Sequence, residues 1–165
     1  MYQIRVVVLA FALLLGCDSA PSVPDNVDQI LVEKGERRLT LLIKGQPVRT
    51  YRVALGGEPI GHKRQEGDER TPEGEYLIDR RNSESSFHRS IRISYPNAED
   101  RAAAEANGVD PGGLIMIHGI RNGLGWIGKL HRFVDWTDGC IAVTNSEMDE
   151  IWGSVQLQTP VEIRP

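Results

Sequence analysis

The sequence predicts a mainly β domain, a small mixed sandwich or barrel-like fold with a few short helices attached. Three observations support this prediction. Short β-branched or Leu-rich runs recur along the chain, Gly-containing turns separate the first of them, and only two segments have the capping pattern of a helix. With 165 residues, the chain has room for one domain after an export segment.

The first half of the chain is predicted to form antiparallel strands. The expected strands are 30–33, 38–43, 48–55, 75–79 and 90–94. Gly35 and Gly45 mark the first two turns, which makes the opening strands a meander. The long polar stretch 56–69 lies between the third and fourth strands, and a loop of that length in a compact domain tends to be functional.

The second half combines strands with two capped helices. Asn97 is expected to cap a helix over 98–107, and Thr144 with Glu147 forms a capping box for a second helix that places Met148, Ile151 and Trp152 on one face. The apolar runs 114–118, 141–143 and 161–163 are expected strands. The first of these ends on His118 and the second begins beside Cys140.

Composition excludes some classes of function. The hydrophobic share is 40% and the charged share 25%, as in an ordinary globular domain. The formal net charge is −4 and the pI about 5.6, which offers no broad basic field for nucleic acid.

Residues 1–16 are predicted to be a signal peptide. Arg5 precedes the apolar run 6–15, which is too short to span a bilayer permanently. The run ends Leu14-Leu15-Gly16-Cys17, which resembles the bacterial lipobox and implies that Cys17 is lipidated. A plain secretory signal cut near Ala20 is the alternative.

Residues 17–28 are expected to be a flexible tether, which leaves residues 29–165 as the folded domain. The protein is therefore expected in the periplasm or cell envelope, held at a membrane by a lipid anchor. Asp18 after the anchor resembles an inner-membrane retention signal of enterobacteria.

If Cys17 is the anchor, Cys140 has no disulfide partner, which is unusual in an exported protein. Cys140 is then either an inert buried thiol or a nucleophile. His118 lies 22 positions earlier, and if the two strands are neighbours, both side chains meet at one rim of the sheet, where pairing favours a thiolate and an imidazolium. Gly139 permits a tight turn, and the N–H groups of Gly139 and Cys140 could face an oxyanion.

Ile117-His118-Gly119 followed by Thr137-Asp138-Gly139-Cys140-Ile141 resembles the signature of the L,D-transpeptidase (YkuD-like) catalytic domain. The upstream Gly56-Gly57 and Thr71-Pro72-x-Gly74-x-Tyr76 agree with it, so the resemblance covers about 29–165. It implies that Cys140 attacks the carbonyl of a diaminopimelate residue in a peptidoglycan stem, with His118 as general base and the Gly119 carbonyl orienting it. The acyl group then passes to an amine or to water, and no cofactor is implied.

The chain departs from the family pattern at two positions. Asp138 stands where the family usually has His, and Ala142 where it usually has Arg. The stretch 135–145 resembles a variant branch, at least one member of which releases a peptidoglycan-linked lipoprotein. A carboxylate beside Cys140 would raise the thiol pKa, so we expect Asp138 to point away from the sulfur, toward a substrate ammonium or a backbone donor.

The remaining candidates are weighed against simpler roles. Thr137, Arg121 and Trp126 are candidate substrate contacts, with solvent exposure as the alternative for Arg121; Trp136 is expected to be a packing residue. The segment 125–135 would form a lid, and His131, His62 and His88 are expected to be exposed loop residues. Because these histidines are scattered, no metal site is expected.

Two functions of other classes remain open. A degenerate fold could bind peptidoglycan without catalysis, or the chain could be a secreted structural protein with an inert core cysteine. The presence of both His118 and Cys140 favours an enzyme, and the loss of the usual His and Arg favours hydrolysis over transfer.

Overall fold

The computed structural model describes residues 23–165, so the predicted signal peptide and Cys17 lie outside the described residues. The strands are β1 Gln29–Glu33, β2 Arg38–Ile43, β3 Gln46–Arg52, β4 Gly74–Ser85, β5 His88–Ile93, β6 Met116–His118, β7 Ile141–Ala142 and β8 Pro160–Arg164. The helices are α1 Ala98–Ala106, the 3₁₀ segment η1 Gly125–Phe133, and α2 Asn145–Ser154. Within the described range, every helix is too short or too polar to cross a bilayer.

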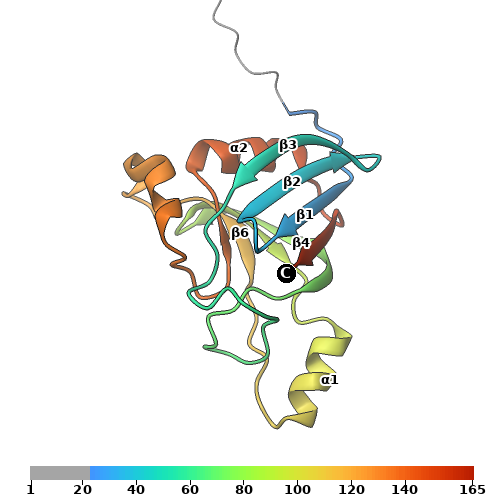
Figure 1. Ribbon diagram of the computed structural model, residues 1–165. Coiled ribbons are helices and arrows are strands. Elements are labelled where there is room, and N and C mark those ends of the chain that lie inside the picture. The colour runs from blue at the N-terminus through green and yellow to red at the C-terminus, as the bar shows by residue number, and fades with distance from the viewer. Residues whose placement is uncertain (1–22) are drawn as a thin grey trace, which may run out of the picture.

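The eight strands form one mixed sheet in the order β3-β2-β1-β8-β4-β5-β6-β7. Strands β3, β2 and β1 lie side by side at one end of this order (Figure 1). The predicted antiparallel meander is confirmed as β1, β2 and β3, while β1 pairs with β8 and β6 with β7 in parallel. The first residues of β4 pair with β8 and the later ones with β5, so this long strand joins the two halves of the sheet.

The two ends of the sheet also meet. Ala54, just after β3, exchanges two backbone hydrogen bonds of 3.0 and 2.8 Å with Ala142 in β7. The sheet is therefore closed in the manner of a barrel around a core that includes Ile30, Leu41, Ile78 and Ile117. This confirms the predicted mainly β fold.

Some strand boundaries differ from the prediction. The strand expected at 75–79 extends to Ser85, because its polar second half is paired with β5. The strand expected at 114–118 is only Met116–His118, since Leu114 has a φ of 57° and is exposed. Ordered packing also begins before Gln29: Val27 is buried, and the Asp28 N–H donates to the Leu42 carbonyl.

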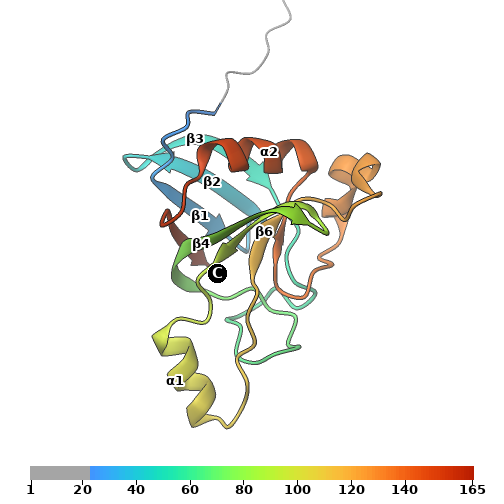
Figure 2. The ribbon, with the colours of Figure 1, turned by 180° about the vertical axis from the view of Figure 1, so that it is seen from behind.

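Both predicted helix caps are present. Asn97 and Asp100 form a reciprocal capping box at α1, and Thr144 and Glu147 form one at α2. Met148 and Ile151 of α2 are buried, so this helix closes one end of the core, as the views from front and back show (Figures 1 and 2).

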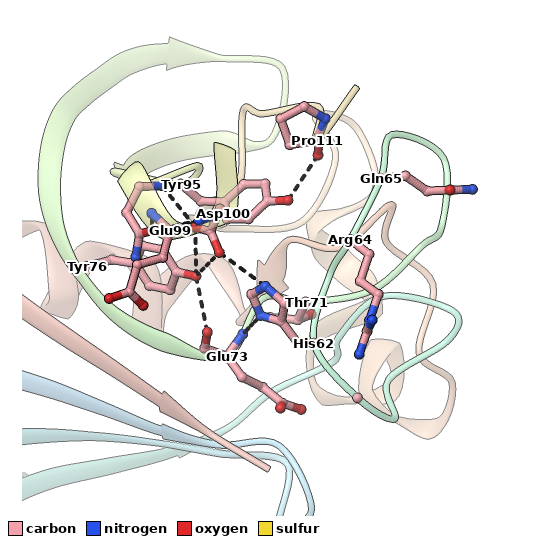
Figure 3. A network of polar contacts seen from close by, with 12 residues as sticks. His62, Arg64, Gln65, Thr71, Glu73, Tyr76, Tyr95, Glu99, Asp100 and Pro111 are labelled. Carbon is pink, nitrogen blue, oxygen red and sulfur yellow. Dashed lines mark hydrogen bonds and ion pairs between the residues drawn. The ribbon is translucent and has the colours of Figure 1, made fainter. Parts of the chain in front are cut away.

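A buried polar network fastens α1 to the sheet (Figure 3). Asp100 accepts hydrogen bonds from the Tyr76 hydroxyl at 3.1 Å and from Nε2 of His62 at 3.1 Å. His62 Nδ1 in turn accepts from the Glu73 N–H at 2.9 Å. His62 is thus a structural link between the long loop and α1. The expectation that His62 is a free surface histidine was wrong, because its Nε2 is bonded to the carboxylate of Asp100, which lies 38 positions later in the sequence.

Candidate active site

The parallel pairing of β6 and β7 brings His118 and Cys140 together. Ile117 lies opposite Ile141 and His118 opposite Ala142, so Cys140 lies two positions before the residue that pairs with His118. Because side chains alternate along a strand, His118 and Cys140 occupy the same face, while the two isoleucines enter the core. The expected meeting of the two side chains at one rim is therefore present.

His118 and Cys140 line one pocket of about 310 Å³. Its other lining residues are Asn82, Ser85, Ser86, Phe87, Met116, Trp136, Thr137 and Asp138. The pocket thus lies between the tip of the β4–β5 hairpin and the segment that leads to the cysteine.

Thr137 shapes the turn that presents the cysteine. Its hydroxyl donates to the Cys140 carbonyl at 2.7 Å and accepts from the Gly139 N–H at 3.2 Å. This hydrogen bond corrects one expectation: the Gly139 N–H is already occupied within the turn, which leaves the Cys140 N–H as the candidate oxyanion donor. Thr137 lines the pocket but its hydroxyl serves the turn.

Two glycines allow the backbone to pack closely behind the cysteine. A Cβ on Gly139 would lie 2.4 Å from the Arg70 carbonyl oxygen, and Gly139 has a φ of 110°. A Cβ on Gly56 would lie 2.0 Å from the Glu69 carbonyl oxygen. The same Cβ on Gly56 would lie 2.9 Å from the Gly139 Cα, so the loop 56–70 packs directly against the turn before Cys140. A side chain at Gly139 would force the loop and the turn apart, and one at Gly56 would also force apart the two ends of the loop.

Buried cations fasten this supporting loop. Lys34 is 2% exposed, and its ammonium donates to the carbonyls of Gly61 and Thr71 and to Glu73, at 2.6 to 2.8 Å. Lys63, also buried, pairs with Asp68 at 2.8 Å. Lys63 also donates to the Gln65 carbonyl at 3.0 Å, so both buried ammonium groups hold the loop.

Asp135 anchors the start of the catalytic segment. One carboxylate oxygen accepts from the Leu55 N–H at 2.9 Å, and the other accepts from Arg37 at 2.9 Å. Arg37 is 98 positions away, so sequence spacing offered no signal for this contact.

The His118 ring is oriented by the next residue. Its Nδ1 lies 2.6 Å from the Gly119 carbonyl oxygen, which fixes the proton on Nδ1 and leaves Nε2 as the basic nitrogen. A Cβ on Gly119 would lie 2.8 Å from Asn145 Oδ1 and 3.0 Å from the His88 Cβ. Asn145 also accepts from the Ile120 N–H at 2.8 Å, so this residue, which the sequence did not single out, holds the His118-Gly119 turn.

Burial governs the protonation of both groups. It raises the pKa of the Cys140 thiol, with Asp138 acting in the same direction and a backbone hydrogen bond and Lys63 acting against it. It lowers the pKa of His118, against a smaller opposing effect of the Gly119 carbonyl. Both shifts disfavour the expected thiolate–imidazolium pair in the free protein, because both charged forms are poorly solvated here.

Aromatic rings surround His118. Its ring centroid lies 4.7 Å from that of Phe87 and 5.8 Å from that of Trp136. His131, which was expected to be exposed, is buried beside Trp136 and accepts a 3.4 Å hydrogen bond from the indole N–H. Trp136 itself is 37% exposed and lines the pocket, so it is more than the packing residue expected from the sequence.

The other candidates fall in different places. Asp138 is exposed and lines the pocket, whereas Arg121 and Trp126 are exposed outside its lining. Trp126 belongs to η1, the segment expected to form a lid, and is 80% exposed. Among residues 23–165, no group of three or more metal-ligating side chains comes together.

Comparisons with known proteins show which family the chain belongs to. YafK of Escherichia coli (strain K12), a protein classed with the L,D-transpeptidases, is 30% identical over 159 residues, covering 87% of this chain and 57% of YafK. The crystal structure of Pgp2, a helical cell shape determining protein of Campylobacter jejuni, has a TM-score of 0.65 and 26% identity over 84% of this chain and 48% of Pgp2.

A Mycobacterium smegmatis L,D-transpeptidase, at 11% identity over 83% of this chain and 58% of its own, has a TM-score of 0.54 and shares the fold. The chain thus spans about half the length of these relatives. The family model for the L,D-transpeptidase catalytic domain (YkuD) matches residues 28–163, nearly all of the described chain. The chain belongs to the YkuD family of L,D-transpeptidase catalytic domains.

Proposed function

We propose that this protein is a cysteine enzyme of peptidoglycan that acts on diaminopimelate-containing stem peptides through an acyl-enzyme on Cys140. One observation carries the proposal: Cys140 and His118 line the same pocket, and the Gly119 carbonyl holds His118 with its basic Nε2 unprotonated. Family membership implies the peptidoglycan substrate.

In the proposed reaction, the His118 Nε2 takes the proton of the Cys140 thiol as the sulfur attacks the scissile carbonyl. The Cys140 N–H faces the oxyanion that forms. The tetrahedral intermediate collapses to a thioester, and the imidazolium gives its proton to the departing amine. Water or an amine then attacks the thioester while His118 accepts its proton, and the thiol is regenerated with this proton.

In the proposed reaction, the Cys140 thiol loses its proton only when it attacks the substrate. In the free protein the Cys140 sulfur lies 3.6 Å from the Leu114 carbonyl, to which its S–H donates. A raised thiol pKa and a lowered imidazole pKa both disfavour the ion pair, so proton transfer is coupled to attack. This arrangement protects an exported free thiol from oxidation, because the thiolate is the reactive form.

Hydrolysis is the branch that we favour. Ala142, which occupies the position of the usual Arg, is fully buried and pairs with Ala54, so this position supplies no cation to the pocket. The charged side chain that does line the pocket beside the two reactive residues is Asp138, which suits a substrate ammonium. A stem peptide joined to a lipoprotein is a candidate donor.

Incubation with purified muropeptides followed by mass spectrometry tests the reaction. Shortened stems or a released lipoprotein fragment would indicate hydrolysis, and diaminopimelate-to-diaminopimelate cross-links would indicate transfer. Cys140→Ala and His118→Gln should each abolish turnover, whereas Cys140→Ala should still bind the muropeptide. Binding by the unaltered protein without turnover would instead support the second candidate, a non-catalytic peptidoglycan-binding lipoprotein.

We also propose that the domain lies in the cell envelope on a lipid anchor at Cys17. The basis is the lipobox-like sequence alone, since Cys17 lies outside the described residues. Mass spectrometry of the mature N-terminus tests this proposal: a diacylglyceryl-modified Cys17 is expected, and an unmodified N-terminus near Ala20 would indicate plain secretion.

A further inference from the structure

The base of this site lacks the carboxylate that often accompanies a catalytic histidine. In the part of the chain that the structure describes, the ion pairs of histidines involve His62 and His88, and none involves His118. The ring contacts of His118 are the Gly119 carbonyl and the rings of Phe87 and Trp136. The positive charge that the proposed reaction places on His118 must therefore be stabilised in another way.

Because His118 is buried, water cannot stabilise the positive charge on its ring. His118 is 4% exposed, and an imidazolium in such a place has lost nearly all its hydration. The Gly119 carbonyl serves one ring nitrogen only. Aromatic faces attract cations within about 6 Å of the ring centroid, and more strongly when the cation is desolvated.

We propose that Phe87 and Trp136 are positioning residues that stabilise the His118 imidazolium formed when Cys140 attacks, through cation–π interaction. The inference rests on the proposed function. The Phe87 ring lies 4.7 Å from His118, tilted by 47°, and the indole lies 5.8 Å away at 69°. The Phe87 and Trp136 rings are also neighbours of each other, with centroids 6.1 Å apart and planes 28° from parallel, so both lie beside the base.

His131 fixes the indole in this position. Its Nδ1 accepts the Trp136 N–H, while its Nε2 is buried with no partner among the described residues. The hydrogen bond to Trp136 is thus the one polar contact of the His131 ring among the described residues.

The charge state of His131 fits this role. Burial, followed by the neighbouring Arg132 and opposed by Glu147, lowers the pKa of His131 to about 4. His131 is therefore neutral when His118 becomes charged, and it does not repel the imidazolium. The other charged groups nearby are the Arg132–Glu147 pair on the η1 and α2 side, the His88–Asp149 pair beyond Gly119, and Asp138 in the pocket.

NMR titration of the histidine ring signals in the full chain tests the inference without requiring turnover, with His118→Gln used to assign the resonance. Trp136→Leu and Phe87→Leu keep apolar bulk but remove the π face. Each should lower the His118 pKa by about half a unit or more, because the charged form loses stabilisation. Trp136→Phe should retain most of the wild-type value.

Phe133→Leu is the matched control, since Phe133 is 83% exposed on η1 and should leave the titration unchanged. An unchanged or raised His118 pKa in a folded Phe87→Leu or Trp136→Leu variant would overturn the inference. Should Trp136→Leu fail to fold, the Phe87→Leu titration decides.

Kinetics supply the second readout where turnover is found. Both Leu variants should reduce kcat about three- to tenfold and shift the acidic limb of the pH–kcat/KM profile to lower pH, with Trp136→Phe restoring most of both. A rise in KM alone would mean that the rings contact substrate only, and would contradict the inference. Absence of all turnover in the wild type, with the titration shifts present, would refute the proposed function but not the π stabilisation.

Discussion

Two segments around the candidate site are built in opposite ways. Behind Cys140, the loop 56–70 packs backbone to backbone against the turn that carries the cysteine and is fastened by the buried ammonium groups of Lys34 and Lys63. On the exposed side, η1 lies outside the pocket lining and presents apolar side chains to solvent, among them Trp126 at 80% and Phe133 at 83%, although its His131 is buried. Cys140 is thus held by a rigid wall, whereas the exposed side chains of η1 contribute little to the packing of the domain.

The largest expected effect is at the glycines of the rigid wall. Gly56→Ala places a Cβ 2.0 Å from the Glu69 carbonyl oxygen and 2.9 Å from the Gly139 Cα, so the two ends of the loop and the turn before Cys140 can no longer pack together. We expect at least about 3 kcal/mol of lost stability and loss of turnover, measured by chemical denaturation and muropeptide assay. Gly153→Ala is the control: its Cβ meets nothing within 4 Å in α2, and it should be neutral or slightly stabilising.

Removal of the Lys34 ammonium comes next. Lys34→Met keeps the buried stem but leaves two carbonyls and Glu73 without their donor. A loss of about 2 to 4 kcal/mol in unfolding free energy is expected. Lys129→Met, an exposed lysine of η1, should change stability by less than about 0.5 kcal/mol. Equal losses of unfolding free energy in the two variants would contradict the proposed difference between the loop 56–70 and η1.

The same wall should carry an acid-sensitive ion pair. Although burial alone raises the pKa of Asp68, donation by the backbone of Arg64 and by Lys63 outweighs it and lowers the pKa from 3.8 to about 2. A lowered folded pKa contributes stability above pH 3.8 that is lost as the pH falls through about 2. Asp68→Asn should remove up to about 2 kcal/mol of this pH dependence in acid unfolding curves; superimposable curves would contradict the assignment.

The smallest effect is expected on the exposed side. Phe133→Ser should change the unfolding free energy by less than about 0.5 kcal/mol, because its side chain is 83% exposed. Thermal unfolding and muropeptide turnover would measure it against the wild type. A large loss of stability would show that η1 belongs to the rigid part of the domain.

Local signals predicted the parts of the fold that depend on neighbours in sequence. The turns at Gly35 and Gly45, the caps at Asn97 and Thr144, and the β1–β3 meander all follow from residues within a few positions of each other. Features that depend on residues far apart in the sequence were predicted poorly. The polar second half of β4 is a strand only because β5 pairs with it, His62 is bonded to Glu73 and Asp100 from other segments, and His131 is buried.

In the candidate site too, some residues were predicted from the local sequence and others were not. Its reactive pair was predicted because His118 and Cys140 end and begin apolar strands within a recognisable pattern. Arg121 and Trp126, chosen for proximity in sequence, lie outside the pocket. Asn145 and Asp135, which hold the two catalytic segments, were not singled out, because the contacts that give them importance span 25 and 98 positions.

By itself the sequence determined the family, the mainly β class and the two candidate reactive residues, since these depend on residue types at set spacings. The tertiary structure alone decided how this pair is solvated and which side chains surround His118. Burial raises the pKa of Cys140 and lowers that of His118, and the Phe87 and Trp136 rings reach the base from different segments. Solvation is a property of the folded surroundings, and no local pattern encodes it.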